Sequence, residues 1–363
     1  MNAGYNPDFN PTGIEGGVDT NNLPWIDLPQ APGLAIKPLR ASSESGMFSV
    51  IARIRAGTTV RDLVYLGGMD MIVLSGGMRY VGGALESTLE PGTWGYVPAN
   101  ARIGALTADV DTEFLGNFYG PVAFLGDKGR VSSLLTALDV LAAAHDRGLT
   151  LIPNTLAECM QPPEAKKSPK WQGPREPLAI AGNSAGALVD KAASGSSASQ
   201  VHPHFVDTKQ VPWIENPSVP DMGLKVLRVS EETGITSLIV RHNGVAGPHY
   251  HLGAADFLVL SGRIGYRAGP PEGYGPGVWF YEPAGARHEA TQRVSDEDLI
   301  YTANVYGPLQ FDEGPGTPIV AVQSWMQYKA MADSVGVKLV RNTFEGDGSL
   351  LAWAPLGESA ARL

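Results

Sequence analysis

The sequence predicts a mainly β protein that contains two copies of one small domain. Short apolar, β-branched runs alternate with turns, and the 44 Gly and 28 Pro residues supply those turns. Four blocks of similar sequence occur twice in the same order, 185 to 188 residues apart. A length of 363 residues leaves room for two domains of ordinary size.

The repeated blocks indicate an internal duplication. The first match joins VDTNNLPWI, from Val18, with VDTKQVPWI, from Val206. The second match joins LGGMDMIVLSGGMRY, from Leu66, with LGAADFLVLSGRIGY, from Leu252. Two later blocks, PGTWGYVPANARI and NFYGP, recur as PGVWFYEPAGARH and NVYGP. The offsets drift by only a residue or two, as short loop insertions between two copies would produce.

The duplication sets the predicted domain boundaries. The segment between the copies is rich in Gly, Ser, Ala and Pro, which is typical of a linker. We predict an N-terminal arm, a first domain, a linker, a second domain and a C-terminal tail over residues 1–17, 18–150, 151–205, 206–340 and 341–363.

Each copy contains apolar runs that are expected to form strands of an antiparallel sandwich or small barrel. These runs cover residues 46–54, 70–76 and 93–99 in the first copy and 234–242, 256–262 and 278–284 in the second. Apolar residues at helical spacing predict one helix after each set of strands, over 132–148 and 321–336.

Composition excludes several classes of protein. A net charge of −10 without a basic stripe argues against a nucleic-acid partner. The sequence contains no run of about 20 apolar residues, so no transmembrane helix is expected. The start of the chain lacks the pattern of a secretion signal. The single cysteine, Cys159, cannot form an internal disulfide. A reducing, cytoplasmic location without membrane contact is therefore expected.

The second copy carries a pattern of histidines that the first copy lacks. His249 and His251 are two residues apart, so on a strand they point to the same face. Turns of the Pro-Gly and Pro-x-Gly types bracket a later strand, which is expected to return His288 beside this pair. Three converging imidazoles suit a divalent transition metal with open coordination positions. We therefore predict a metal site formed by His249, His251 and His288.

The first copy has no equivalent of this site. The local offsets place Leu63, Tyr65 and Ile103 opposite the three histidines, and Val97 opposite Glu282. The ligands and the acid are lost together, while the turns and the Pro-Trp blocks remain. The first copy is therefore expected to have a filled apolar core without a metal, and to act as a built-in partner of the second copy.

These motifs resemble those of the cupin family. GPHYHLGAADFLVLSG carries the first cupin motif, and PGVWFYEPAGARH carries the second. More narrowly, VDT…PW followed by EPAGARH is similar to the cupin dioxygenases that cleave 2,4'-dihydroxyacetophenone or acetylacetone. The resemblance covers roughly residues 18–150 and 206–340. It implies a mainly β fold of two tandem cupin domains (double-stranded β-helix, jelly roll) with a few helices.

The resemblance also implies an activity: a non-haem Fe(II)-dependent dioxygenase that cleaves a C–C bond of an enolisable ketone with O2. The substrate would be a β-diketone or a hydroxyaryl ketone. An enolate bound through two oxygens neutralises the metal charge, and its electron donation helps ferrous iron to activate oxygen. Iron is implied by the family alone, because such ligands also bind Zn, Mn, Ni or Cu. A homo-oligomer is left open.

Further candidate residues surround the predicted ligands. The resemblance carries Glu282 over as an acid that contacts a ligand histidine or orients the substrate, although a surface position is the alternative. Arg241 and Tyr301, on predicted strands, are additional catalytic candidates, although aromatic residues on strands usually pack in the core. Asp256 becomes a fourth ligand if its strand begins with a bulge. Its counterpart Asp70, in the copy without histidines, favours a structural role.

Two other interpretations of the site stay open. One is a different cupin metalloenzyme: a ring-cleaving or thiol dioxygenase, a decarboxylase or an isomerase. The other is a non-catalytic cupin sensor that binds a metal or a small molecule. His202 and His204 are also two residues apart, but the proline between them predicts an exposed segment outside the site.

Overall fold

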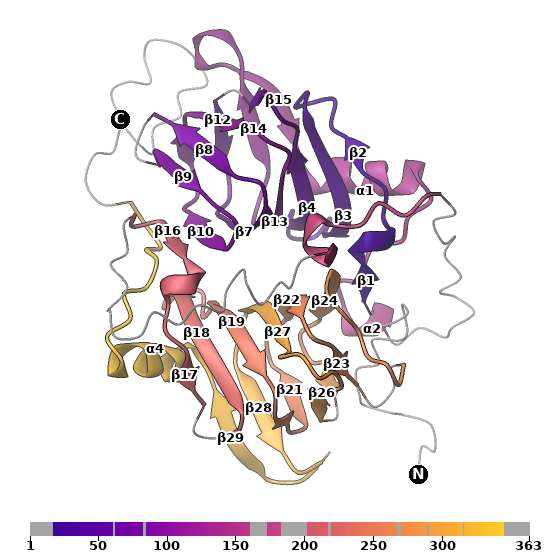
Figure 1. Cartoon of the computed structure of the whole chain (residues 1–363), viewed down its shortest axis with the longest axis vertical. Coiled ribbons are helices and arrows are strands. Elements are labelled where there is room, and N and C mark those ends of the chain that lie inside the picture. Colours follow the sequence, from indigo (N-terminus) through magenta and orange to yellow (C-terminus); the bar gives the residue numbers. More distant parts are fainter. Residues whose placement is uncertain are drawn as a thin grey trace.

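The computed structural model of the chain shows two β-rich halves stacked on one another (Figure 1). It describes residues 17–344 except 61, 83–84, 160–172, 183–201, 217–218, 267–269, 289 and 315. Nearly all of the predicted N-terminal arm, most of the predicted tail and much of the predicted linker lie outside the described residues. In the part of the chain described, no helix has the length and apolar character needed to cross a membrane.

The strands are short, as the frequent turns predicted. Those described in the first half are β1 (Val18–Asp19), β2 (Ile26–Asp27), β3 (Leu34–Ala41), β4 (Phe48–Ile54), β5 (Thr58–Val60), β6 (Leu63–Tyr65), β7 (Met69–Ser75), β8 (Met78–Val81), β9 (Ser87–Leu89), β10 (Thr93–Val97), β11 (Ala101–Ile103), β12 (Ala105–Ala108), β13 (Thr112–Phe118), β14 (Val122–Leu125) and β15 (Val131–Leu135). Those in the second half are β16 (Phe205–Asp207), β17 (Ile214–Glu215), β18 (Met222–Val229), β19 (Thr236–His242), β20 (Val245–Ala246), β21 (His249–His251), β22 (Ala255–Ser261), β23 (Ile264–Gly265), β24 (Val278–Glu282), β25 (Arg287–His288), β26 (Thr291–Arg293), β27 (Ile300–Val305), β28 (Leu309–Asp312) and β29 (Ile319–Gln323).

Each half builds one large antiparallel sheet with smaller sheets. The large sheets have seven strands each, in the orders β16-β10-β7-β13-β4-β3-β2 and β1-β24-β22-β27-β19-β18-β17. The corresponding smaller sheets include β11-β6-β14-β15 and β25-β21-β28-β29. Apolar side chains from the large and smaller sheets of a half share one core. The mainly β fold with two jelly-roll halves is therefore confirmed, and so are the six predicted strands.

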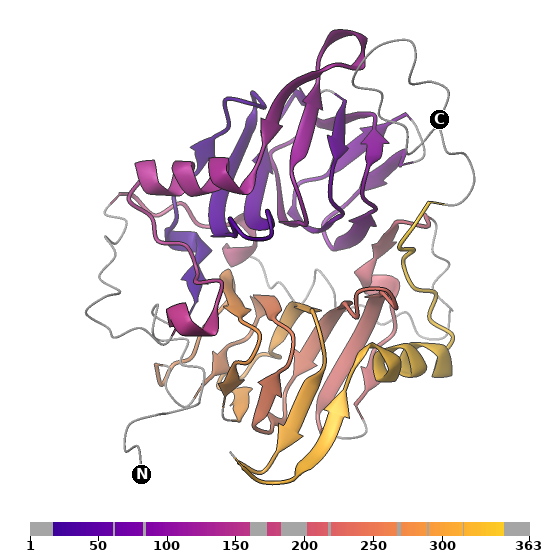
Figure 2. The same ribbon diagram turned by 180° about the vertical axis from the view of Figure 1, so that it is seen from behind.

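The described helices are few. They are α1 (Ala137–Asp146), α2 (Leu156–Cys159) and α4 (Trp325–Ser334), with one-turn helices η2 (Thr20–Asn22), η3 (Asp127–Gly129), η5 (Ala179–Gly182) and η6 (Thr208–Gln210). Figure 2 shows α1 against the first half and α4 against the second, where they pack on β3 and β18.

The predicted starts of the two longer helices were wrong by four or five residues. In each case the preceding residues continue a strand, β15 or β29, up to a capping residue. Thr136 caps α1 together with Asp139, and Ser324 caps α4 together with Gln327. These reciprocal side-chain to backbone bonds satisfy the first amide groups of a helix, so T-x-x-D and S-x-x-Q mark the true starts.

The two halves exchange short strands. β1 pairs with β24 of the second half and places Val18 opposite Trp279. β16 pairs with β10 of the first half and places Val206 opposite Trp94. Figure 1 shows β1 reaching down toward β24 and β16 lying beside β10. Each large sheet is thus completed by a strand from the opposite half.

The repeated VDT sequence anchors both exchanged strands in the same way. Thr20 donates from its backbone N and from Oγ1 to the carbonyl oxygen of Gly277, at 3.0 and 2.6 Å. Thr208 donates likewise to Gly92, at 3.1 and 2.6 Å. Buried backbone groups need such partners. The threonine therefore serves the exchange in both copies.

A buried lysine and a tryptophan complete each anchor. Lys37 Nζ donates to the Thr20 carbonyl oxygen at 2.9 Å and lies 4.7 Å from the centre of the Trp25 ring. The corresponding lysine and tryptophan of the second copy are Lys225 and Trp213, at 2.8 Å and 4.6 Å. The repeated VDT…PW pattern is thus explained by strand exchange and not by the predicted metal site.

An apolar cluster fills the space between the two large sheets. It receives alternate side chains of both sheets, which point away from the interior of their own half. Its members include Leu39, Ile51, Ile72, Leu74, Trp94 and Leu115 of the first half and Leu227, Ile239, Leu258, Leu260, Trp279 and Ile300 of the second. Each such side chain contributes on the order of 2 kcal/mol when it leaves water, so the halves form one body.

A pair of buried acids lies at this interface. Asp70 accepts hydrogen bonds from Asn117 Nδ2 at 2.9 Å and from the Tyr119 hydroxyl at 2.5 Å. In the second half, Asp256 accepts from Asn304 Nδ2 at 3.3 Å and from the Tyr306 hydroxyl at 2.5 Å. The repeated Asp and Asn-x-Tyr positions therefore build the interface.

One amide joins the two acids. Asn304 Nδ2 lies 3.3 Å from Asp70 Oδ1 as well as 3.3 Å from Asp256 Oδ1. Burial, followed by the charge of Asp70, raises the pKa of Asp256 to about 7. Burial also raises the pKa of Asp70. Two carboxylates that share one dry site resist ionising together.

The interior of the first half is an apolar core. Leu63, Tyr65 and Ile103, which stand opposite the predicted ligands in the repeat, are all buried in it. Ile103 pairs directly with Leu63 across β11 and β6. The Tyr65 hydroxyl lies 3.5 Å from the Tyr80 hydroxyl. The same strands that frame the predicted site in the second half here frame packed side chains.

Asp256→Asn is expected to reduce the pH dependence of stability. The pKa of this carboxyl is about 7 in the fold against 3.8 for an ordinary Asp, so the folded chain binds more protons between these values. The contribution is complete below the lower pKa and is lost as the pH rises to the higher one. Denaturant unfolding between about pH 5 and 7 should show a loss of up to about 1.4 kcal/mol per pH unit in the wild type, and less in the variant.

The matched control is Asp146→Asn, which makes the same change at an acid whose side chain is 79% exposed on α1. It should leave the slope of stability against pH as it is in the wild type. An equally steep slope in Asp256→Asn would contradict the raised pKa of Asp256.

Candidate functional site

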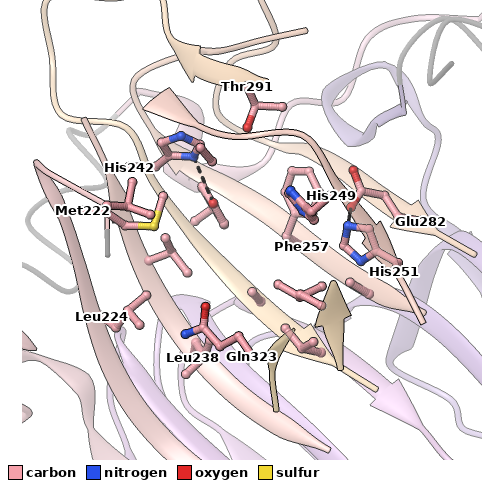
Figure 3. A pocket seen from close by; sticks show the side chains of 18 of the residues that line it. Met222, Leu224, Leu238, His242, His249, His251, Phe257, Glu282, Thr291 and Gln323 are labelled. Carbon is pink, nitrogen blue, oxygen red and sulfur yellow. Dashed lines mark hydrogen bonds and ion pairs between the residues drawn. The ribbon is translucent and has the colours of Figure 1, made fainter. Parts of the chain in front are cut away.

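A cavity of about 110 Å³ lies inside the second half (Figure 3). Strands of the large sheet line it from one side, β21 and β28 line it from another, and α4 contributes Tyr328. More than half of the residues that line it are apolar: Val219, Met222, Leu224, Leu238, Val240, Ala246, Ala255, Phe257, Ile264, Ala303, Val305, Leu309 and Phe311. Its polar side chains therefore stand out as candidates for function.

The histidine pair lies on this cavity. His249 and His251 are 7% and 4% exposed, and their ring centres are 5.0 Å apart. His249 Nδ1 lies 2.8 Å from the carbonyl oxygen of Gly247. Because a carbonyl oxygen only accepts, Nδ1 carries the hydrogen and the lone pair of this ring lies on Nε2. Metal-binding histidines are oriented by such a bond.

A buried carboxylate contacts the second histidine. Glu282 Oε2 lies 2.8 Å from His251 Nε2, and both side chains are buried. The Tyr266 hydroxyl donates to Glu282 Oε1 at 2.8 Å. Burial and the nearby Glu282 raise the pKa of Tyr266, so this hydroxyl keeps its proton and remains a donor. The structure therefore brings Glu282 together with His251 in the interior.

The backbone of the third predicted ligand lies beside the pair. β25 pairs with β21 in a register that places His288 directly opposite His249. The same register in the first half places Ile103 opposite Leu63, and both of those side chains are buried in the core. The side chain of His288 lies outside those that the structure describes. Its role as a ligand stays a prediction.

The chemistry of the predicted donor set fits a transition metal. Among the described side chains, no group of three or more His, Cys, Asp or Glu residues could hold a metal ion. The predicted set therefore depends on His288 joining the two described imidazoles. Three imidazole nitrogens are borderline donors that suit Fe, Zn, Ni or Cu.

The other two catalytic candidates lie in different environments. Tyr301 lines the cavity, and its hydroxyl lies 3.1 Å from His242 Nδ1. Arg241 does not line the cavity, because its neighbours on β19 point inward and it points outward. Arg241 Nη2 donates to Glu215 Oε1 at 2.5 Å, and the guanidinium lies 4.9 Å from the centre of the Trp213 ring. The structure thus brings Tyr301 to the site and not Arg241.

Asp256 borders the cavity but is held at the interface between the halves. Its two carboxylate oxygens accept from Asn304 and Tyr306. The register irregularity of β22 against β27 lies between Val259 and Ser261, not at the start of the strand where a bulge would turn Asp256. These contacts support a structural role for this acid.

Two expectations from the sequence need correction or completion. His204 was expected to be exposed, but it is 2% exposed because it packs on Phe344, with ring centres 4.6 Å apart. Burial lowers the pKa of His204 to about 4. Tyr266 was interpreted from the sequence as a packing residue, because aromatic residues on strands usually pack in the core, and the structure adds a bond from its hydroxyl to Glu282.

Comparison with known proteins gives a family. The sequence profile of the ChrR cupin-like domain matches this chain twice, at residues 15–123 and 201–308. The two matches together cover more than half of the chain and coincide with the two copies of the repeat.

Individual relatives are distant. The acetylacetone-cleaving enzyme of Acinetobacter johnsonii is 26% identical over 115 residues, which are 31% of this chain and 75% of that protein. The crystal structure of the acetylacetone dioxygenase from Acinetobacter johnsonii covers 36% of this chain and 89% of its own, with 22% identity and a TM-score of 0.32. A variant of Bacillus subtilis oxalate decarboxylase covers 94% of this chain and 87% of its own, with 14% identity and a TM-score of 0.46.

Tyr266→Phe is expected to destabilise the second half. The change removes a hydroxyl that donates to a buried carboxylate, and hydrogen bonds to charged groups contribute about 2 kcal/mol. The matched control is Tyr80→Phe, where the hydroxyl faces only another tyrosine at 3.5 Å and about 1 kcal/mol is expected. Denaturant unfolding of metal-free protein measures both. An equal or smaller loss in Tyr266→Phe would contradict the Tyr266–Glu282 bond.

Proposed function

Since the chain belongs to the ChrR cupin-like domain family, we propose that it is a metal-dependent dioxygenase that cleaves a C–C bond of an enolisable ketone with O2. One observation carries the proposal: two buried histidines and a buried carboxylate line an apolar cavity of the second half. The first half has the same strands and only Leu63, Tyr65 and Val97 at these positions. The acetylacetone-cleaving relative points to the class of substrate.

We assign the metal to His249, His251 and His288. Three neutral imidazoles leave the full charge of a divalent ion and leave positions open for substrate and O2. Iron(II) is proposed on the family resemblance, because Zn, Mn, Ni or Cu suit related donor sets. When bound, the ion supplies attachment for the two oxygens of an enolate and the redox chemistry with O2.

Glu282 acts on the site through His251. Its carboxylate is fixed from both sides, since Oε2 contacts His251 Nε2 and Oε1 accepts from Tyr266. A carboxylate held in this way orients the imidazole and makes it a better donor. Loss of such a partner typically weakens metal binding about 10- to 100-fold.

The cavity favours a small organic substrate. Its volume of about 110 Å³ is small, since pockets for drug-sized ligands have about 300 Å³ or more. Its apolar walls exclude water from the reacting groups and bind carbon chains or rings through the hydrophobic effect. A small ketone fits these walls better than a sugar or a peptide does.

The purified protein loaded with ferrous iron should consume O2 when acetylacetone or another β-diketone is added. An oxygen electrode measures the uptake, and a chelated sample is the control. Full occupancy by Mn, Ni or Zn without oxygen consumption would contradict the dioxygenase and favour another cupin reaction. Tight ligand binding without conversion would favour a sensor.

His288→Ala should abolish metal retention and turnover, because it removes one of three proposed ligands. Elemental analysis and oxygen uptake measure the two losses, and thermal unfolding shows whether the fold is kept. The matched control is His202→Ala, which changes a histidine outside the cavity. A His288→Ala protein that keeps its iron and its activity would refute the site.

A further inference from the structure

A second polar group lies on the cavity, away from the histidine pair. His242 is the last residue of β19, and Tyr301 lies on the neighbouring strand β27. His242 Nδ1 lies 3.1 Å from the Tyr301 hydroxyl, and both residues line the cavity. The Tyr301 ring packs 5.1 Å from the ring of Phe257. The pair therefore places hydrogen-bonding atoms on a largely apolar wall.

The pair and the acid Glu282 occupy different ends of the cavity. Strand β22 lies between β24 and β27. Its residue Ala255 pairs with Glu282 of β24 on one side and with Val305 of β27 on the other. Tyr301 lies four residues from Val305 along the same strand, which corresponds to about 13 Å of backbone. Figure 3 likewise shows His242 on one side and Glu282 on the other. A ligand bound near the histidine pair can thus extend toward His242 and Tyr301.

The duplicated chain shows that the fold does not require this pair. The repeat offsets of 188 and 187 residues place Ile54 opposite His242 and Phe114 opposite Tyr301. Both counterparts are buried in the apolar core of the first half. The same strands therefore form with apolar side chains at these positions. Like the histidine pair and Glu282, the polar pair occurs only in the half that has the cavity.

The chemistry of the pair suits recognition of an oxygen. A tyrosine hydroxyl has one hydrogen to donate and two lone pairs, so the bond to His242 leaves it able to bind a ligand. A hydroxyl or carbonyl oxygen of a ligand can form a hydrogen bond with the Tyr301 hydroxyl. An apolar group at the same place would cover the hydroxyl without offering such a bond, which weakens binding.

We propose that His242 and Tyr301 are specificity-determining residues that bind a remote hydroxyl or carbonyl oxygen of the ketone substrate. The assignment rests on the proposed function, because the other end of the substrate is its enolisable ketone. The pair of His242 and Tyr301 selects ketones that carry a polar substituent at the end remote from the ketone over purely apolar ketones of the same size.

The test compares ligands that differ by one hydroxyl. Benzoylacetone and its ortho-, meta- and para-hydroxyphenyl analogues are titrated calorimetrically into the full-length iron-loaded protein without O2. At least one analogue should bind about tenfold more tightly than benzoylacetone, as one added hydrogen bond predicts. The advantage should fall below about threefold in Tyr301→Phe and in His242→Phe. Equal binding of all four ligands by the wild type would overturn the inference.

The variants separate this inference from the proposed function. Tyr65→Phe makes the same chemical change in the core of the first half and should keep the preference. Tyr301→Phe preserves the ring and its packing, so it decides the question alone should His242→Phe fail to fold. A preference that survives in Tyr301→Phe overturns only the inference. If none of the ligands binds the wild type, the proposed function falls and the inference falls with it.

Discussion

The exchange of β1 and β16 is the constraint on which the rest of the structure depends. Each large sheet contains one strand from the other half, so neither sheet is complete by itself. The exchange brings the outer faces of both sheets together, and alternate residues of one strand then serve different surfaces. On β22, Leu258 lies in the cluster between the halves, while Phe257 lines the cavity. The interface therefore fixes one wall of the candidate site.

The duplication separates residues that maintain the fold from residues that serve the site. Thr20, Lys37 and Trp25 recur in the second copy because both exchanged strands need the same anchors. Asp70 and Asn117 recur because the interface is built twice from the same contacts. In the interiors, histidines and a carboxylate of the second copy replace apolar and aromatic residues of the first. One interior is packed, and the other has a cavity with polar groups.

The sequence was sufficient for the fold and for the shared face of two candidate ligands, and the reasons can be named. Alternating apolar runs and the repeat predicted the strands, and the His-x-His spacing predicted that His249 and His251 share a face. The strand exchange could not be predicted, because strands of two or three residues have no period and their partners lie far away in the chain. His204 is buried by Phe344, which is equally remote in sequence. The face on which the Arg241 side chain lies could not be predicted without the register of β19, since a shift of one residue moves a side chain to the other face of a sheet.

The polar groups of the cavity cost stability that the fold itself does not require. A carboxylate and two imidazoles in an apolar interior lose hydration, and hydrogen bonds return only part of it. Glu282 recovers some through His251 and Tyr266. The first half has apolar and aromatic side chains at the same positions, buries no carboxylate or imidazole there, and keeps the same strands. One chain thus contains both an apolar interior and an interior with buried polar groups, and the polar groups occur where the cavity lies. Packing does not explain that restriction, and it is the distribution that the proposed binding of a metal and a small ligand at the cavity requires.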